Sequence, residues 1–288
     1  MSQKTPYLVQ AKMNQDHLKL IISRNFLMAA ACLIAGSWMF SVFLMSNEFN
    51  SSWMMSIHSN PVLPSWIWSF LNLGGDACVA LLILLLIERR PGQLTSWLMK
   101  TWLLGLVFAQ TLKYLLSIPR PASILGTEHL SLIDQPPLLG GSMPSGHALA
   151  AISCGLILIA VLKSKGYKNL TLAGVGLISC CVAWSRVAVG AHWPSDVIAG
   201  AGLALFVLIL STFWERQQSW NLWFQKSSGL GFLIFLHFLI AIHLLFPQSK
   251  LIVVQLIQYL LASISLYRGY VLYRDYFGNM PFALEKKS

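Results

Sequence analysis

The sequence predicts an all-α fold in which a bundle of helices crosses a membrane several times. Charged residues make up 10% of the 288 residues and hydrophobic residues 56%, and the mean hydropathy is +0.64. A soluble domain has about 25% charged residues, so this chain lacks the polar groups that a water-facing surface needs. Apolar runs of about 18 residues or more recur along the chain, and a helix of that length crosses the hydrocarbon core of a bilayer.

The apolar runs predict eight membrane spans. They cover approximately residues 25–46, 62–87, 95–117, 144–162, 169–189, 194–213, 229–246 and 251–272. A polar, basic segment at 1–24 precedes a six-span core at 25–213. Residues 214–288 add a Trp-rich linker, two further C-terminal spans and a charged tail. The stretch with Trp53 and His58 is expected to form an interfacial helix. The long loop at 118–143 is rich in Pro and Gly, and loops of that length are often functional.

The basic residues predict how the chain is oriented. With the N-terminus in the cytoplasm, all but four of the 20 Lys and Arg residues, Lys100 included, fall in cytoplasmic segments, where basic residues concentrate. The four on the opposite side are Lys113, Arg120, Arg186 and Lys250. We therefore expect both termini in the cytoplasm of a bacterium, with the other face of its inner (plasma) membrane opening to the periplasm or outside. The net charge of +10 is spread over short loops, which argues against a nucleic-acid partner.

Three short polar stretches lie at the outer ends of predicted spans. Their sequences are KYLLSIPRP at 113–121, PSGH at 144–147 and SRVAVGAHWPSD at 185–196. Charged groups at membrane depth are expensive and mark functional positions. Lys113 and Arg120 converge without a matching run of carboxylates, which predicts an anionic ligand. Arg offers a planar fork that fits phosphate oxygens, and Lys offers a point charge.

The second and third stretches supply groups that handle protons and anions. Ser145 and Gly146 begin a helix, whose unpaired N–H groups attract anions, and glycine lets the backbone approach a ligand closely. His147 follows them and is placed to give a proton to a leaving oxygen. His192 precedes Asp196 by four residues, so in a helical backbone the two share a face. A carboxylate on one imidazole nitrogen leaves the other free to attack, which makes His192 a candidate nucleophile.

These residues resemble the signature of the type 2 phosphatidic acid phosphatase superfamily, which is KX6RP, PSGH and SRX5HX3D. All three motifs are present, in order and with full spacing, and the resemblance covers about residues 60–213. It implies a phosphohistidine on His192 supported by Asp196, with His147 protonating the leaving group. It also implies that neither a metal nor another cofactor takes part. The residues that it implies for phosphate binding are Lys113, Arg120, Ser145, Gly146 and Arg186.

The resemblance implies a membrane phosphatase acting on a lipid phosphate monoester or diphosphate at the outer leaflet. Undecaprenyl diphosphate is the first substrate we expect; phosphatidylglycerophosphate, phosphatidate and lipid A phosphates are its rivals. The same site would also suit phosphate transfer from lipid to lipid. Haloperoxidases share the anion pocket but are typically soluble. A transporter of anionic lipids is the alternative from another class, and it would show internal repeats and broken helices at mid-bilayer, neither of which is visible in the sequence.

Other notable residues are expected to serve structure. Asp76 is expected either to bond a neighbouring helix or to pair with a site cation, and His237 and His243 to make contacts between helices. Residues expected in a solvated loop, rather than shaping substrate entry, are Glu128, His129 and Asp134. Residues expected in an interfacial aromatic belt are Trp66, Trp193, Trp214, Trp220 and Trp223. Residues expected as small buried hydrophobes are Cys32, Cys78, Cys154, Cys180 and Cys181.

Overall fold

The chain forms a bundle of helices. The computed structural model describes residues 18–19, 21–46, 48–60, 62–88, 90–130, 132–134, 139–247 and 249–276. Nearly all of the predicted N-terminal segment and the predicted tail lie outside the described residues. No strand occurs in the described part, which confirms the all-α prediction. Seven helices are long and apolar enough to cross a membrane, or up to eight if a bent pair counts as one span. The protein is a polytopic membrane protein.

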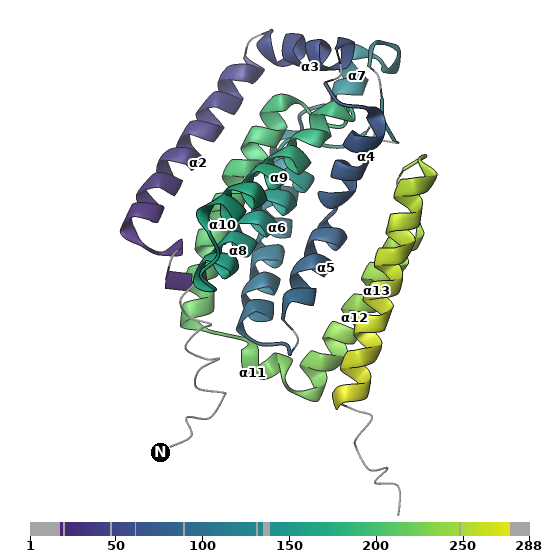
Figure 1. The fold of residues 1–288 in the computed structure, drawn as a ribbon. Coiled ribbons are helices and arrows are strands. Elements are labelled where there is room, and N and C mark those ends of the chain that lie inside the picture. The colour runs from purple at the N-terminus through teal and green to yellow at the C-terminus, as the bar shows by residue number, and fades with distance from the viewer. Residues whose placement is uncertain are drawn as a thin grey trace, which may run out of the picture.

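The helices that build the bundle run up and down in chain order (Figure 1). They are α2 (Arg24–Met45), α4 (Ser65–Gly74), α5 (Ala77–Ile87), α6 (Gln93–Leu116), α8 (Gly146–Ser164), α9 (Asn169–Ala188), α10 (Pro194–Gln217), α12 (Ser227–Leu245) and α13 (Ile252–Tyr276). The remaining elements are α3 (Phe49–Ser59), α7 (Pro121–Leu125), the 3-10 turn η1 (Thr127–His129) and α11 (Asn221–Phe224). The start of α2 and the end of α13 lie on the same side, opposite α3 and α7.

The centre of the bundle is α10, which packs against α2, α6, α8 and α9. Its first half approaches the start of α8 very closely at Gly200. A Cβ atom at Gly200 would lie 2.6 Å from the carbonyl oxygen of Ser145 and 3.1 Å from the Cβ of Ala148. The first of these distances is shorter than real Cβ atoms show against a backbone oxygen, so glycine is required there. This close approach joins the PSGH stretch to the helix that follows His192.

The span predicted at 62–87 is not one continuous helix, because α4 and α5 are bent by 60° at a break between them. Asp76 lies at this break. Its Oδ1 accepts hydrogen bonds from the backbone N–H groups of Cys78 (2.8 Å) and Val79 (3.2 Å), so its side chain caps the start of α5. Its Oδ2 lies 3.0 Å from Nε2 of His243 in α12. Of the two roles expected for Asp76, bonding to a neighbouring helix is confirmed. A run of apolar residues does not reveal such a cap.

Lys100, which was counted among the basic residues of the cytoplasmic segments, is fully buried inside the bundle. Its Nζ is 2.5 Å from Oε2 of Glu215, and both side chains are fully buried. The rings of Trp214 and Trp220 lie 5.6 and 4.9 Å from the same nitrogen. The two rings therefore cover a cation and are not plain belt residues as predicted. Glu215 reaches this position because α10 continues to Gln217, beyond the end predicted at residue 213.

Several smaller expectations are also corrected. Asp134 is half-buried rather than solvated, since its carboxylate accepts hydrogen bonds from Ser69 (2.7 Å) and Asn72 (3.4 Å). Trp193 is buried and donates from Nε1 to the carbonyl of Pro119, so it does not belong to an interfacial belt. None of the five cysteines is fully buried as predicted: Cys32 and Cys180 are exposed, the other three are half-buried, and all are free thiols. Cys78 and Cys154 still pack against the main apolar core.

Other expectations are confirmed. Glu128 and His129 are exposed in the loop between α6 and α8, and Trp66 and Trp223 are exposed as well. Nδ1 of His237 lies 3.1 Å from Oγ of a serine in α13, which is the expected contact between helices. Residues 49–59 form the expected helix α3, which runs across one end of the bundle (Figure 1).

Candidate active site

The three polar stretches meet at one end of the bundle, as the sequence predicts. Lys113 lies in the last turn of α6 and Arg186 in the last turn of α9. Ser145 is the N-cap of α8, and Asp196 lies in the first turn of α10. All four helix ends are on the same side of the bundle, beneath α3 and α7 (Figure 1).

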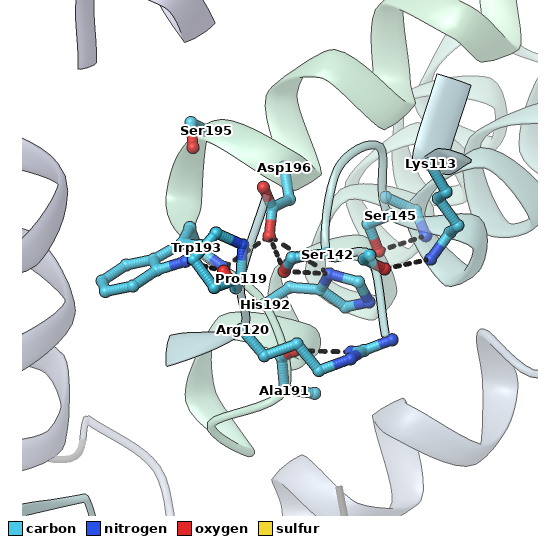
Figure 2. Close-up of polar contacts among 12 residues, drawn as sticks. Lys113, Pro119, Arg120, Ser142, Ser145, Ala191, His192, Trp193, Ser195 and Asp196 are labelled. Carbon is cyan, nitrogen blue, oxygen red and sulfur yellow. Dashed lines mark hydrogen bonds and ion pairs between the residues drawn. The ribbon is translucent and has the colours of Figure 1, made fainter. Parts of the chain in front are cut away.

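His192 is held by a carboxylate, as Figure 2 shows. Its Nδ1 lies 3.2 Å from Oδ2 of Asp196, which is the expected contact, although His192 lies in the turn before α10 and not on a shared helical face. The same oxygen accepts a hydrogen bond from the backbone N–H of Trp193 (2.9 Å). His192 is 3% exposed. Because Asp196 occupies Nδ1, the ring carries its proton on that side and presents the lone pair of Nε2 away from the carboxylate.

Ser142 also supports this histidine, although none of the three motifs includes it. Its hydroxyl donates to Oδ2 of Asp196 and lies 3.3 Å from Nδ1 of His192. Its backbone N–H donates to the carbonyl of Ile118 (2.8 Å). The long loop at 118–143 therefore delivers a positioning residue to the site. Its place two residues before PSGH is the one signal that could have drawn attention to it.

Two of the site cations donate to backbone carbonyls. Lys113 donates from Nζ to Gly141 (3.1 Å). Arg120 donates from Nη1 to Ala191 (2.9 Å) and from Nε to Leu139 (3.1 Å). Among the described residues, no carboxylate forms an ion pair with either cation. Backbone carbonyls orient these side chains without neutralising them, so the charge is available to an anion.

Arg186 is buried and is oriented by a residue that sequence reasoning missed. Its Nη1 donates to Oδ1 of Asn72 in α4, and the amide of Asn72 donates in turn to Asp134 (3.4 Å). Nε of Arg186 has no hydrogen-bond partner within the part of the chain that the structure describes. A buried guanidinium with an unpaired N–H group is costly, and an anion at this position would satisfy it.

The start of α8 completes the site. The backbone N–H of Ser145 donates to the carbonyl of Asp196 (3.0 Å), which fixes this helix end beside His192. A Cβ atom at Gly146 would meet nothing within 4 Å, so no other part of the protein crowds this position at the start of α8. His147 packs against the end of α4, where a Cβ atom at Gly75 would lie 3.2 Å from its Cδ2. Gly75 thus makes room for the second histidine.

Burial lowers the pKa of His192 well below the ordinary 6.5. The positive charges of Arg186, Arg120 and Lys113, in that order, lower this pKa further. All three cations therefore act on the histidine, which is neutral at pH 7 with the Nε2 lone pair available. The arrangement is a neutral imidazole surrounded by fixed positive charge.

Comparison with known proteins places this geometry in a family. The family model described as the PAP2 superfamily matches residues 94–220. Residues 94–220 belong to the PAP2 superfamily. The resemblance was expected to begin at about residue 60, and the matched PAP2 segment begins later, at residue 94. It contains all eight predicted site residues. An undecaprenyl-diphosphatase from Sulfolobus acidocaldarius is 33% identical over 128 residues, which are 44% of this chain. The match spans 58% of the length of that relative. No solved structure matches the chain.

A second polar group lies outside the PAP2 segment, at the bend between α4 and α5. Asp76, Cys78 and His243 bring potential metal-ligating atoms within 4.8 Å of one another. Both oxygens of Asp76 already accept contacts from the protein, one from the start of α5 and the other from His243. The group therefore has a structural explanation, since it joins α12 to the bend beside His147.

Proposed function

We propose that this protein is an integral membrane phosphatase that hydrolyses a phosphate monoester or diphosphate of a lipid. The observation that carries the proposal is the convergence of cations without carboxylate partners around one neutral histidine held by a carboxylate. The Sulfolobus relative is named an undecaprenyl-diphosphatase, so undecaprenyl diphosphate is the first substrate to test. Phosphatidylglycerophosphate, phosphatidate and lipid A phosphates are the next.

In the first step, the Nε2 lone pair of His192 attacks phosphorus, and the bond from phosphorus to the leaving oxygen breaks. His147 gives that oxygen its proton. Negative charge grows on the other phosphoryl oxygens as phosphorus becomes five-coordinate. Fixed positive charge in a site that excludes water stabilises this state strongly. The residues that we assign to these oxygens are Lys113, Arg120, Ser145, Gly146 and Arg186.

In the second step, water attacks the phosphorus of the phosphohistidine, and His147 accepts a proton from the water. The bond between phosphorus and Nε2 breaks, which releases phosphate and returns His192 to its neutral form. Asp196 holds the same tautomer through both steps. A lipid alcohol that replaced water in this step would give phosphate transfer between lipids, so an excess of such an alcohol tests for the transferase.

The position of the site suits a substrate that stays in the membrane. The catalytic groups lie at the ends of helices that are long and apolar enough to cross a membrane, so a phosphate head group at the site leaves its chain at bilayer depth. From the distribution of basic residues we assign the site to the periplasmic or outer face of a bacterial inner membrane. Both termini then lie in the cytoplasm.

The proposal is tested by measuring phosphate release from a panel of purified lipid phosphates in detergent. We expect release from at least one lipid, with His192→Ala reducing it to background while the protein still inserts and purifies normally. His129→Ala, which changes an exposed histidine of the outer loop, is the matched control and retains full activity. Normal turnover by His192→Ala would refute the nucleophile, and no release from any lipid would refute the phosphatase.

The bend between α4 and α5 favours a second candidate, a transporter of anionic lipids. Transporters use broken helices next to their binding sites, and this break lies beside His147. Asp76 caps the start of α5 at this break, which weakens the case for transport. The two functions differ in their product, because a transporter moves the lipid between leaflets with its phosphate intact.

A further inference from the structure

An apolar groove with a volume of about 390 Å³ lies among α4, α5, α8, α9 and α13. Its walls on α8 include Ala151, Cys154 and Leu158, and its wall on α9 includes Ile178 and Val182. These helices carry His147 and Arg186 at their outer ends. The groove is therefore built from the same helices as the catalytic site.

The helical register shows that the groove continues downward from the site. Ala151 follows His147 by four residues, so it lies one turn below it on the same face of α8. Val182 precedes Arg186 by four residues, so it lies one turn below it on α9. Val182 also contacts the end of α4, because a Cβ atom at Gly75 would lie 3.2 Å from its side chain as well as from His147.

The depth of the groove matches one leaflet of a bilayer. From His147 to Leu158 the axis of α8 advances by about 16 Å at 1.5 Å per residue. The hydrocarbon core of a bilayer is about 30 Å thick. A chain that begins at the site and follows this groove therefore ends near the middle of the membrane, as the chain of a lipid in that leaflet does.

One wall of the groove comes from α13, which lies outside the PAP2 segment and packs against α4 and α5 at the edge of the bundle (Figure 1). Ile257 and Leu261 supply this wall. A second apolar hollow shares Phe70 and Ile257 with the groove and leads along α13 to Lys250. Lys250 is thus an exposed cation at the outer end of the apolar path, where it attracts a phosphate head group.

We propose that this groove binds the hydrocarbon chain of the substrate and that α13 sets which chain lengths fit. The inference rests on the proposed lipid phosphatase function and extends it to the last helix, α13. The occupant is the chain attached to the phosphate at the site, because the groove continues from that site and its lining is apolar. The exposed cation Lys250 lies at the outer end of the same apolar path.

The test fills the groove from α13 and leaves the catalytic groups in place. Leu261→Trp puts a large ring into the groove, whereas Leu260→Trp puts the same ring on the adjacent residue, which is 60% exposed. Each variant is assayed with one lipid phosphate of about 16 chain carbons and one of about six. We expect Leu261→Trp to lower kcat/KM for the long chain by roughly tenfold. It should leave the short chain nearly unchanged, and Leu260→Trp should leave both unchanged.

Two outcomes of this assay would overturn the inference. Equal loss for both substrates in Leu261→Trp would mean general damage to the site, and no loss for either would mean that the chain lies elsewhere. Stability of each variant in detergent is measured in parallel, so that misfolding is recognised. If Leu261→Trp unfolds, Cys154→Phe fills the same groove from α8 and is read by the same comparison.

A binding readout separates failure of the groove from failure of the phosphatase function. A long-chain lipid phosphate with a diazirine at mid-chain is photolysed with the wild-type protein, and the labelled residues are mapped. We expect label at Cys154 and Ile178 that an unlabelled lipid phosphate displaces and the corresponding alcohol does not. Equal displacement by both means that an ordinary bilayer lipid fills the groove, which contradicts the inference. Phosphate-dependent labelling without any hydrolysis would support binding of the chain in the groove and contradict the phosphatase function.

Discussion

Helix α6 carries two lysines whose surroundings differ, although both lie within one apolar helix. Lys100 and Lys113 are roughly 20 Å apart along the axis at 1.5 Å per residue. Lys100 is fully buried against Glu215 at 2.5 Å and is covered by two tryptophan rings. Lys113 lies at the outer end and donates to the backbone carbonyl of Gly141. One lysine has its counter-charge within the chain, and the other has a carbonyl that orients it.

The two environments indicate that Lys100 serves the structure and that Lys113 is available to a ligand. A buried charge is costly unless it is paired. Lys100 is buried and is paired with Glu215 within the chain. At the outer end Lys113 shares a small volume with Arg120 and Arg186, and among the described residues no carboxylate pairs with any of them. The missing counter-charge is the signature of an anionic ligand from outside the chain.

Breaking the inner pair gives the largest expected effect. Lys100→Met leaves Glu215 buried without its partner, and removing one member of a buried ion pair costs about 3–5 kcal/mol of unfolding free energy. Denaturant unfolding in detergent measures this loss. Activity per folded molecule should stay within about twofold, because Lys100 is far from the site. The double variant Lys100→Met/Glu215→Leu should recover most of the stability, and a double variant no more stable than the single one would contradict the pairing argument.

Removing the outer lysine should have the opposite profile. Lys113→Met is expected to lower kcat/KM for a lipid phosphate by about 10²–10³-fold, as loss of one group that stabilises transition-state charge does. Its unfolding free energy should not fall, because removing one of several like charges relieves repulsion. Steady-state kinetics and unfolding are measured on the same preparation. A large loss of stability with little loss of activity would show that Lys113 is structural like Lys100.

A smaller loss is expected from Ser142→Ala. This change removes the hydroxyl that donates to Asp196, and a hydrogen bond to a charged group is worth about 1.5–3 kcal/mol. We expect kcat to fall about tenfold or somewhat more, with KM little changed, because the hydroxyl positions His192 and does not touch the lipid. Ser164→Ala, which changes an exposed serine at the far end of α8 whose hydroxyl bonds only within its own helix, is the control. A change in KM alone would contradict a positioning role.

The smallest effect is a shift in pH dependence. His192 must be neutral to attack, and its pKa lies well below 6.5 because of burial and of three nearby cations. The acid limb of kcat/KM should therefore lie below pH 6.5. Lys113→Met removes one repelling charge, raises the pKa of His192 and moves that limb to higher pH, whereas Lys100→Met leaves it in place. A limb that stays in place in Lys113→Met would show that this lysine does not act on His192.

The sequence was sufficient for much of the site because the decisive signals are local. Hydropathy predicted where the helices end. The residue types and spacing within each motif predicted that His192, Asp196 and the cations beside them belong to the site. The sequence placed His192 and Asp196 together from their separation of four residues, and the structure has their contact at 3.2 Å. His192 lies outside α10, however, and the contact comes from the capping turn in which Asp196 also accepts the backbone N–H of Trp193.

The remaining features depend on partners that are distant in the sequence. Lys100 was counted with the cytoplasmic segments because its partner, Glu215, is on another helix, and Asn72 showed no sign that it orients Arg186. The bend at Asp76 lies within a long apolar run, where hydropathy has no signal for a cap. Ser142 has no feature in the sequence beyond its place before PSGH, because its contact with Asp196 forms only in the folded protein. Such relations appear when the helices are packed together.

The central claim, that His192 receives the phosphoryl group, is tested most directly by trapping the intermediate. The purified protein is mixed with a lipid carrying radioactive phosphate, quenched in alkali within one turnover, and digested for mapping. The account predicts a label that is stable in alkali, lost in acid, located on the peptide with His192 and absent from His192→Ala. Turnover without any protein-bound label at these times, or a label on a different residue, would contradict it.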